Sequence, residues 1–301
     1  MSTPTTLELP TGVRRTTVAS ARGAFAVLEA LPATGVAHLG TALLVPGYTG
    51  SKEDFINVLG PLAAGGRRVL AIDMRGQHET KGPDDPAAYQ TGQLGRDVAA
   101  LAAATQTRHL LGHSYGGLVA RAAVLDGEYL PASLTLLSSG PSAVPGTRAE
   151  ELRFLLDDVK DARHADLGAK ITEIWDDRLA PRAAAAGTPA DIIDFLRARM
   201  LGSNPTGLVT MARDLLNAAD RARELADANV PTFVLYGEDD NAWPAAVQEQ
   251  MAAELGAARR CIPVAAHSPA VEAPATTAQA LTEFWNAAEG VSAAAIATRR
   301  T

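Results

Sequence analysis

The chain has 301 residues, of which 47% are apolar and 20% are charged, a balance that is ordinary for a globular protein in water. Its formal net charge of -7 argues against nucleic acid or an anionic membrane as the main partner. A single cysteine excludes an internal disulfide framework, and the lack of an apolar run of 18 or more residues argues against a membrane-spanning helix.

The first residues lack the apolar stretch of a secretion signal, which predicts a cytoplasmic protein. Two strands, residues 15–20 and 24–31, are predicted first, and a turn at Arg22-Gly23 would join them as a hairpin. Short apolar runs then alternate with helical patterns, and this alternation predicts a doubly wound, mostly parallel α/β sheet whose strands are buried on both faces. The other predicted strands are 41–47, 68–73, 108–114, 133–139, 232–237 and 259–264, and the predicted helices are Lys52–Ala64, Gly92–Ala104, Gly117–Asp126, Pro244–Leu255 and Ala275–Ala288.

One interval, residues 141–229, breaks the alternation. It contains no convincing strand, and segments such as EELRFLLDDVK and GLVTMARDLLN place leucines on one helical face. A helical insertion of this length between two strands predicts a cap over a core made of residues 1–140 and 230–290. The last residues, 291–301, show no packing pattern and are expected to be disordered.

The last predicted strand contains the only cysteine, Cys261, in the run RRCIPV. Because this run reads as a buried strand, we expect a structural thiol in the interior. A reactive thiol is the alternative, and it would require exposure and a positively charged environment.

The segment GHSYG, residues 112–116, stands between a predicted strand and a predicted helix. A turn this abrupt forces the residue at its apex, Ser114, into a strained backbone conformation. Gly112 and Gly116 carry no Cβ atoms that would collide as the chain folds back. The pattern is typical of the G-x-S-x-G nucleophile elbow, in which the serine hydroxyl projects at the end of the sheet. A glycine-rich turn with a surface serine is the alternative.

A serine hydroxyl becomes a nucleophile only with a base that a third group orients. His267 follows the last predicted strand, and the loops after parallel strands meet at the edge of the sheet where Ser114 emerges. Asp239 and Asp240 follow the preceding strand, which gives the chain order Ser, Asp, His expected with an elbow. His113 is expected to be structural, because neighbouring side chains along a strand point to opposite faces.

Taken together, these stretches resemble the α/β-hydrolase fold family, in its serine-nucleophile branch with a helical cap domain. The resemblance covers about residues 14–288 and is carried by PGYTGS, DMRGQ, GHSYGG and GEDDNAWP followed by HSPAVEAP. It implies cofactor-free and metal-free acyl transfer at one site. The residues that it implies there are Ser114 as nucleophile, Asp240 as acid, His267 as base, and the backbone N–H groups of Tyr48 and Tyr115 as the oxyanion hole.

Two departures from the family pattern stand near this site. Pro46 occupies a position where most relatives have histidine, and His78 and Thr80 stand where relatives often have glycine and serine. We expect His78 to be a surface loop residue, with a position facing the pocket as the alternative. The helical insertion is expected to line the pocket with aromatic side chains such as those of Phe154, Trp175 and Phe195.

The expected activity is hydrolysis of a carboxylic ester or related acyl bond in a small-molecule substrate, through an acyl-enzyme. Because one fold supports many reactions, two alternatives stay open. One is a hydrolase or lyase that cleaves a carbon–carbon bond, and the other is a non-catalytic ligand receptor. The sequence leaves the oligomeric state open.

Overall fold

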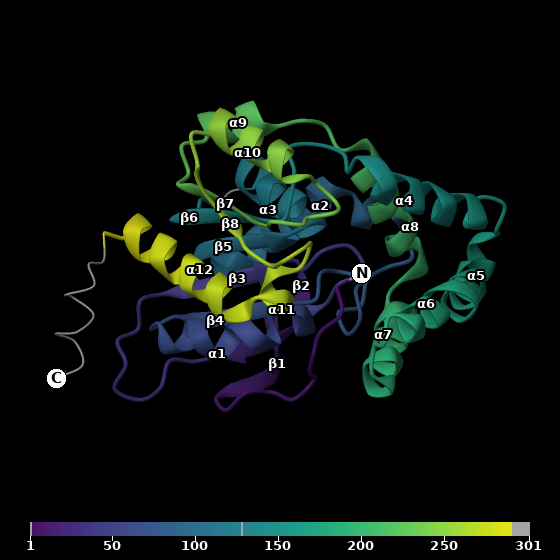
Figure 1. The fold of residues 1–301 in the computed structure, drawn as a ribbon, viewed down its shortest axis with the longest axis horizontal. Helices are drawn as coiled ribbons and strands as arrows, with labels where there is room; N and C mark the ends of the chain where they lie inside the picture. The colour runs from purple at the N-terminus through teal and green to yellow at the C-terminus, as the bar shows by residue number, and fades with distance from the viewer. Residues whose placement is uncertain (1, 128, 291–301) are drawn as a thin grey trace.

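The computed structural model describes residues 2–127 and 129–290. One twisted sheet lies between two layers of helices, and helices α4 to α8 form a lobe beside this core (Figure 1). The tail that the sequence predicts to be disordered, residues 291–301, lies outside the described residues. No helix within the described part of the chain is long and apolar enough to cross a membrane.

All eight predicted strands are present in a single sheet, in the order β1-β2-β4-β3-β5-β6-β7-β8. The first two form the predicted antiparallel hairpin, and β2 is antiparallel to β4. All other neighbours are parallel, so the strands from β4 to β8 end at one edge of the sheet. The strands are β1 Val13–Ser20, β2 Gly23–Ala30, β3 Thr41–Val45, β4 Arg68–Ile72, β5 Thr107–His113, β6 Ser133–Leu137, β7 Thr232–Gly237 and β8 Ala258–Ile262.

The helices of the core cover the two faces of the sheet (Figure 1). One apolar cluster joins α1 and α12 to the sheet, and a second joins α2, α3 and α10 to its other face. Buried apolar side chains thus fill both faces of the strands β3 to β7, which agrees with their nearly continuous apolar runs. The core helices are η1 Lys52–Phe55, α1 Ile56–Ala64, η2 Pro86–Tyr89, α2 Thr91–Ala104, α3 Tyr115–Asp126, α10 Ala245–Glu254, α11 Pro269–Glu272 and α12 Pro274–Ala288.

The interval between β6 and β7 is helical, as predicted. Most of its helices surround an apolar cluster that includes Trp175, Leu196 and Met200. Side chains of α4, and further side chains of α8, belong to the main cluster of the core, which joins the lobe to the sheet layer. The elements are α4 Gly146–Val159, η3 His164–Asp166, α5 Leu167–Ile174, the π-helical turn η4 Trp175–Leu179, α6 Ala180–Ala185, α7 Ala190–Gly202, α8 Pro205–Asn217 and α9 Ala222–Asp227.

The prediction that Cys261 is buried was wrong. The side chain is an exposed free thiol. Its strand, β8, lies at the edge of the sheet and pairs only with β7, and four of its five residues are exposed. Partial burial and the nearby carboxylates of Glu238 and Glu249 raise the pKa of the Cys261 thiol. Little of it is therefore in the nucleophilic thiolate form at neutral pH.

Candidate active site

The turn between β5 and α3 has the strained geometry that the sequence predicts. Ser114, at its apex, has a φ of 55°, which is rare for a residue other than glycine. A Cβ atom on Gly112 would lie 2.1 Å from the carbonyl oxygen of Gly116. A Cβ atom on Gly116 would lie 2.3 Å from the carbonyl oxygen of Pro46. Both glycines are therefore required for the close approach of three backbone segments at this turn.

Three side chains that the sequence places in separate loops meet in one hydrogen-bonded chain. The Oγ atom of Ser114 lies 2.9 Å from Nε2 of His267, and Nδ1 of His267 lies 2.9 Å from Oδ1 of Asp240. The three residues follow β5, β8 and β7, whose ends lie at one edge of the sheet. Asp239, the other candidate acid, is exposed. Its backbone N–H donates a hydrogen bond to the carbonyl oxygen of Ala265.

The carboxylate of Asp240 is held on both oxygens. Oδ1 also accepts a hydrogen bond of 2.9 Å from the N–H of Ala242, and Oδ2 accepts one of 2.9 Å from Nε2 of Gln248. Gln248 is fully buried in α10, and its Nε2 also donates to the carbonyl oxygen of Trp243 at 2.8 Å. Gln248 is not recognisable from the sequence, because a glutamine eight residues beyond the acid belongs to no local pattern.

His113 supports the backbone of the neighbouring histidine. Its Nε2 lies 2.7 Å from the carbonyl oxygen of His267, and since a carbonyl can only accept, this nitrogen carries the proton. Burial, together with the proximity of His267, lowers the pKa of His113 to about 3, so the ring is neutral at physiological pH. His113 is the structural residue that the sequence predicts, and its contact is with the base-bearing loop.

The two predicted oxyanion donors belong to segments next to the serine. Tyr115 is the first residue of α3, where backbone N–H groups have no partner within the helix and the helix dipole favours negative charge. Tyr48 follows Gly47, on which a Cβ atom would lie only 3.0 Å from Cβ of Ser114. Neither backbone N–H donates to an acceptor within residues 2–127 and 129–290. Both groups are therefore available to a bound molecule.

His78 and the three aromatic residues that were expected to line the pocket lie in different surroundings. His78 is half-buried and meets the ring of Phe195 edge-on, with 5.6 Å between ring centroids. It therefore lies between the core and α7 and is not a surface loop residue. Burial and the charge of Lys52 lower its pKa. Of the other two aromatics, Trp175 is buried in the lobe and Phe154 is 62% exposed.

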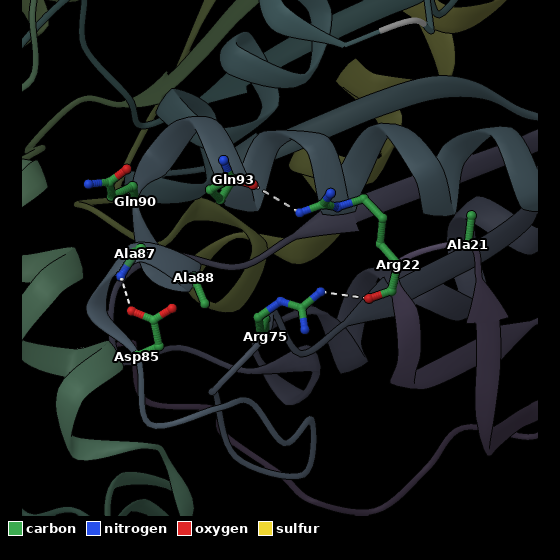
Figure 2. Close-up of a pocket in the computed structure, with 8 residues that line it drawn as sticks. All are labelled: Ala21, Arg22, Arg75, Asp85, Ala87, Ala88, Gln90 and Gln93. Carbon is green, nitrogen blue, oxygen red and sulfur yellow. Dashed lines mark hydrogen bonds between the residues drawn. The ribbon is translucent and has the colours of Figure 1, made fainter.

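A separate hollow of about 450 Å³ opens at the start of α2, as Figure 2 shows. Its two arginines, Arg22 and Arg75, both donate to the carboxylate of Asp97 at 2.6 Å, so that each already has an anionic partner. None of its lining residues belongs to the hydrogen-bonded chain of Ser114. The lining residues are Ala21, Arg22, Arg75, Asp85, Ala87, Ala88, Gln90 and Gln93.

Within residues 2–127 and 129–290, no three or more histidine, cysteine, aspartate or glutamate side chains are placed to hold a metal ion. The groups that the site brings together are the side chains of Ser114, His267 and Asp240.

The chain is similar to known proteins in family, in part of its sequence and in fold. A family model described as "Alpha/beta hydrolase family" matches residues 42–280. A protein named "Putative carbamate hydrolase RutD" from Variovorax paradoxus (strain S110) is 38% identical over 110 residues, 36% of this chain. The matched part is only 40% of that relative's length.

Solved structures extend the similarity to nearly the whole chain. An esterase from Thermogutta terrifontis has a TM-score of 0.67 at 22% identity, with 91% of this chain and 99% of that chain covered. Esterase RhEst1 from Rhodococcus sp. ECU1013 has a TM-score of 0.64 at 21% identity, with 91% and 98% covered. At such identities the likeness establishes the fold.

Proposed function

The chain belongs to the alpha/beta hydrolase family, and from this premise we propose that it is a serine hydrolase that cleaves a carboxylic ester or related acyl bond. The observation that carries the proposal is the hydrogen-bonded chain from Ser114 through His267 to Asp240, with 2.9 Å at each step. A nucleophile, a base and an orienting acid in this geometry are the groups that acyl transfer to serine requires.

In the proposed reaction, Ser114 Oγ attacks the substrate carbonyl while His267 Nε2 takes its proton. Asp240 keeps the proton of His267 on Nδ1 and stabilises the imidazolium that forms. The tetrahedral intermediate collapses, His267 gives its proton to the departing alcohol, and the acyl group stays on Ser114. Water, deprotonated by His267, then attacks the acyl-enzyme, and His267 returns that proton to Ser114 Oγ as the acid is released.

The negative charge on the carbonyl oxygen is proposed to be bound by the N–H groups of Tyr48 and Tyr115. A preorganised donor of this kind typically contributes about 3 kcal/mol of transition-state stabilisation. The N-terminus of α3 adds its partial positive charge at the same point.

We further propose that residues 141–229 act as a cap over a catalytic core made of residues 1–140 and 230–290. One link between them is Asp214 of α8, whose carboxylate accepts from both the N–H and the hydroxyl of Thr91, at 2.6 and 2.8 Å. The same hydroxyl lies 3.0 Å from the phenol of Tyr115, the residue after the nucleophile. Location in the cytoplasm stays a prediction from the sequence.

A carbamate is the second candidate for the scissile group, and the RutD relative favours it. The same attack on a carbonyl carbon would apply, with nitrogen on one side of that carbon. Matched p-nitrophenyl esters and carbamates of equal chain length, assayed side by side, separate the two candidates by their kcat/KM values.

The proposal is tested with a fluorophosphonate probe and the same ester panel. We expect one label on the native protein, its complete loss in Ser114→Ala, and ester turnover that disappears in the same variant. A label that persists in Ser114→Ala would show that another residue is the nucleophile. Absence of both label and turnover in the folded protein would favour the non-catalytic receptor.

A further inference from the structure

A fully buried glutamine, Gln77, holds the loop that carries Tyr48. Its Nε2 donates a hydrogen bond of 2.9 Å to the carbonyl oxygen of Gly47. Its Oε1 accepts one of 3.2 Å from the N–H of Met74. A carbonyl can only accept and an N–H can only donate, so these two partners fix which end of the amide faces each of them.

The position of Gln77 is itself fixed by its own loop. Its backbone N–H donates to the carbonyl oxygen of Met74 at 2.9 Å. The carboxylate of Asp73 accepts the N–H of Lys52 at 2.8 Å and the Lys52 ammonium at 2.8 Å. The loop after β4 is therefore attached to the Tyr48 loop at two points, one on each side of Tyr48.

The contact with Gly47 determines the direction of the Tyr48 N–H, because both groups belong to one peptide unit. In a planar trans peptide the carbonyl and the N–H point in opposite directions. A donor that holds the Gly47 oxygen on one side turns the Tyr48 N–H to the other side. Gly47 also packs against Ser114, with 3.0 Å between the Ser114 Cβ and the position of a Cβ on Gly47.

A second donor, the N–H of Gly50, also reaches the Gly47 oxygen, at 3.0 Å. That bond closes a turn within the loop and therefore moves with the loop. Among the described residues, the bond from Gln77 is the one that ties the Gly47 carbonyl to a separate segment, the segment that follows β4. The orientation of this peptide relative to the rest of the core thus depends on Gln77.

We propose that Gln77 is a positioning residue for the oxyanion hole: it fixes the Gly47–Tyr48 peptide so that the Tyr48 N–H faces the oxygen on which negative charge develops. This inference rests on the proposed function, since that charge forms only if Ser114 attacks a carbonyl. A donor aimed at the developing oxyanion acts mainly in the transition state, so its loss lowers kcat and changes KM little.

Two variants test the role of Gln77. Gln77→Met removes both hydrogen bonds at similar volume, and Gln77→Glu in its ionised form keeps an acceptor for the Met74 N–H but has no donor for the Gly47 oxygen. We expect kcat for a p-nitrophenyl ester to fall about 10- to 100-fold in each, with KM within about threefold of wild type. Binding of a trifluoromethyl ketone, which forms a tetrahedral adduct, should weaken by the same factor as kcat/KM.

The matched control is Thr80→Val in the same loop. Thr80 is buried, and its hydroxyl accepts from the N–H of Ala26, on the side of the loop that faces β2. This variant removes one buried hydrogen bond but does not touch the Gly47 carbonyl. A comparable loss of thermal stability with kcat within about twofold of wild type would separate positioning from general stability.

The outcomes distinguish a failure of the proposed role of Gln77 from a failure of the proposed hydrolase function. Active, labelled wild type together with Gln77 variants that keep both kcat and ketone affinity would overturn the role of Gln77 alone. Failure of both variants to fold would make Gln77 a folding residue and overturn it as well. Wild type that neither turns over an ester nor is labelled at Ser114 would contradict the proposed function, and the role of Gln77 with it.

Discussion

Arg199 of α7 and Asp54 of η1 form an ion pair with 2.7 Å between Nη1 and Oδ1, although their side chains are only 1% and 3% exposed. The same guanidinium donates to the carbonyl oxygen of Ser2 at 2.6 Å. Burial raises the pKa of Asp54, even though Arg199 acts in the opposite direction. Without Arg199, a charged Asp54 carboxylate in this buried position would therefore lower the stability of the fold.

Arg199→Met is expected to lower the free energy of unfolding by about 3 kcal/mol, because it leaves the Asp54 carboxylate buried and unpaired. Urea unfolding measures this change. The control is Arg197→Met in the same helix. The Arg197 side chain is 46% exposed and pairs with Asp176, so its loss should change the free energy of unfolding by less than about 0.5 kcal/mol. Equal effects of the two variants would contradict a special role for the buried pair.

Acid stability should depend on Glu289, just after α12. Its carboxylate lies 2.9 Å from Arg67, 2.6 Å from Arg108 and 3.3 Å from the ring of His109. Burial opposes ionisation, but the contacts with His109, Arg108 and Arg67 outweigh it and lower the pKa of Glu289 from 4.5 to about 2. The folded protein therefore holds this group ionised in a pH range where the unfolded chain protonates it.

Glu289→Gln should reduce the free energy of unfolding by about 2 kcal/mol at pH 7, since it removes charged hydrogen bonds. A pKa lowered by folding gives a contribution that is fully present above pH 4.5 and is lost as the pH falls toward about 2. The difference between wild type and variant should thus shrink steadily below pH 4.5 in urea titrations. Glu283→Gln, at an exposed pair with Arg260, should show little difference at any pH.

Substitution of Gly112, in the elbow, and of Gly92, in α2, should have opposite effects on stability. Gly112→Ala would place a Cβ atom 2.1 Å from a backbone oxygen, so we expect loss of fluorophosphonate labelling and a large loss of thermal stability. Gly92→Ala, in α2, would place its Cβ where no atom lies within 4 Å, and it should raise stability by up to about 1 kcal/mol. A stable, labelled Gly112→Ala protein would show that the turn can relax.

The sequence predicts the parts of this protein that depend on local pattern. The strands are recognisable because apolar runs of five or six residues alternate with helical periodicity, and the elbow because two glycines flank Ser114. The meeting of Ser114, His267 and Asp240 follows from one topological rule, that loops after parallel strands share an edge.

The sequence could not indicate contacts and burial that arise only when the chain is folded. Gln77 and Gln248 act on a carbonyl 30 residues away and a carboxylate eight residues away, and no spacing rule marks such contacts. Cys261 was misplaced because burial of a strand depends on its place in the sheet, and β8 is the strand at the edge. Residue type and local hydropathy carry no information on strand order.

Asp239 and Asp240 are adjacent carboxylates, and we expect Asp240 to be the one that orients His267. The carboxylate of Asp240 accepts from three donors, the ring of His267, the N–H of Ala242 and the amide of Gln248. An asparagine has one acceptor oxygen and a donating NH2 group, so it cannot satisfy all three, and it removes the charge that stabilises the imidazolium.

Asp240→Asn should therefore lower kcat for a p-nitrophenyl ester by about 10³- to 10⁴-fold, as loss of the acid does in serine proteases. The variant should stay folded, with a loss of no more than about 2 kcal/mol in the free energy of unfolding. Asp239 is exposed, so Asp239→Asn should reduce kcat by less than about tenfold. If Asp239→Asn is instead the crippled variant, the acid of the site is one residue earlier; if neither matters, His267 is oriented without a carboxylate from this loop.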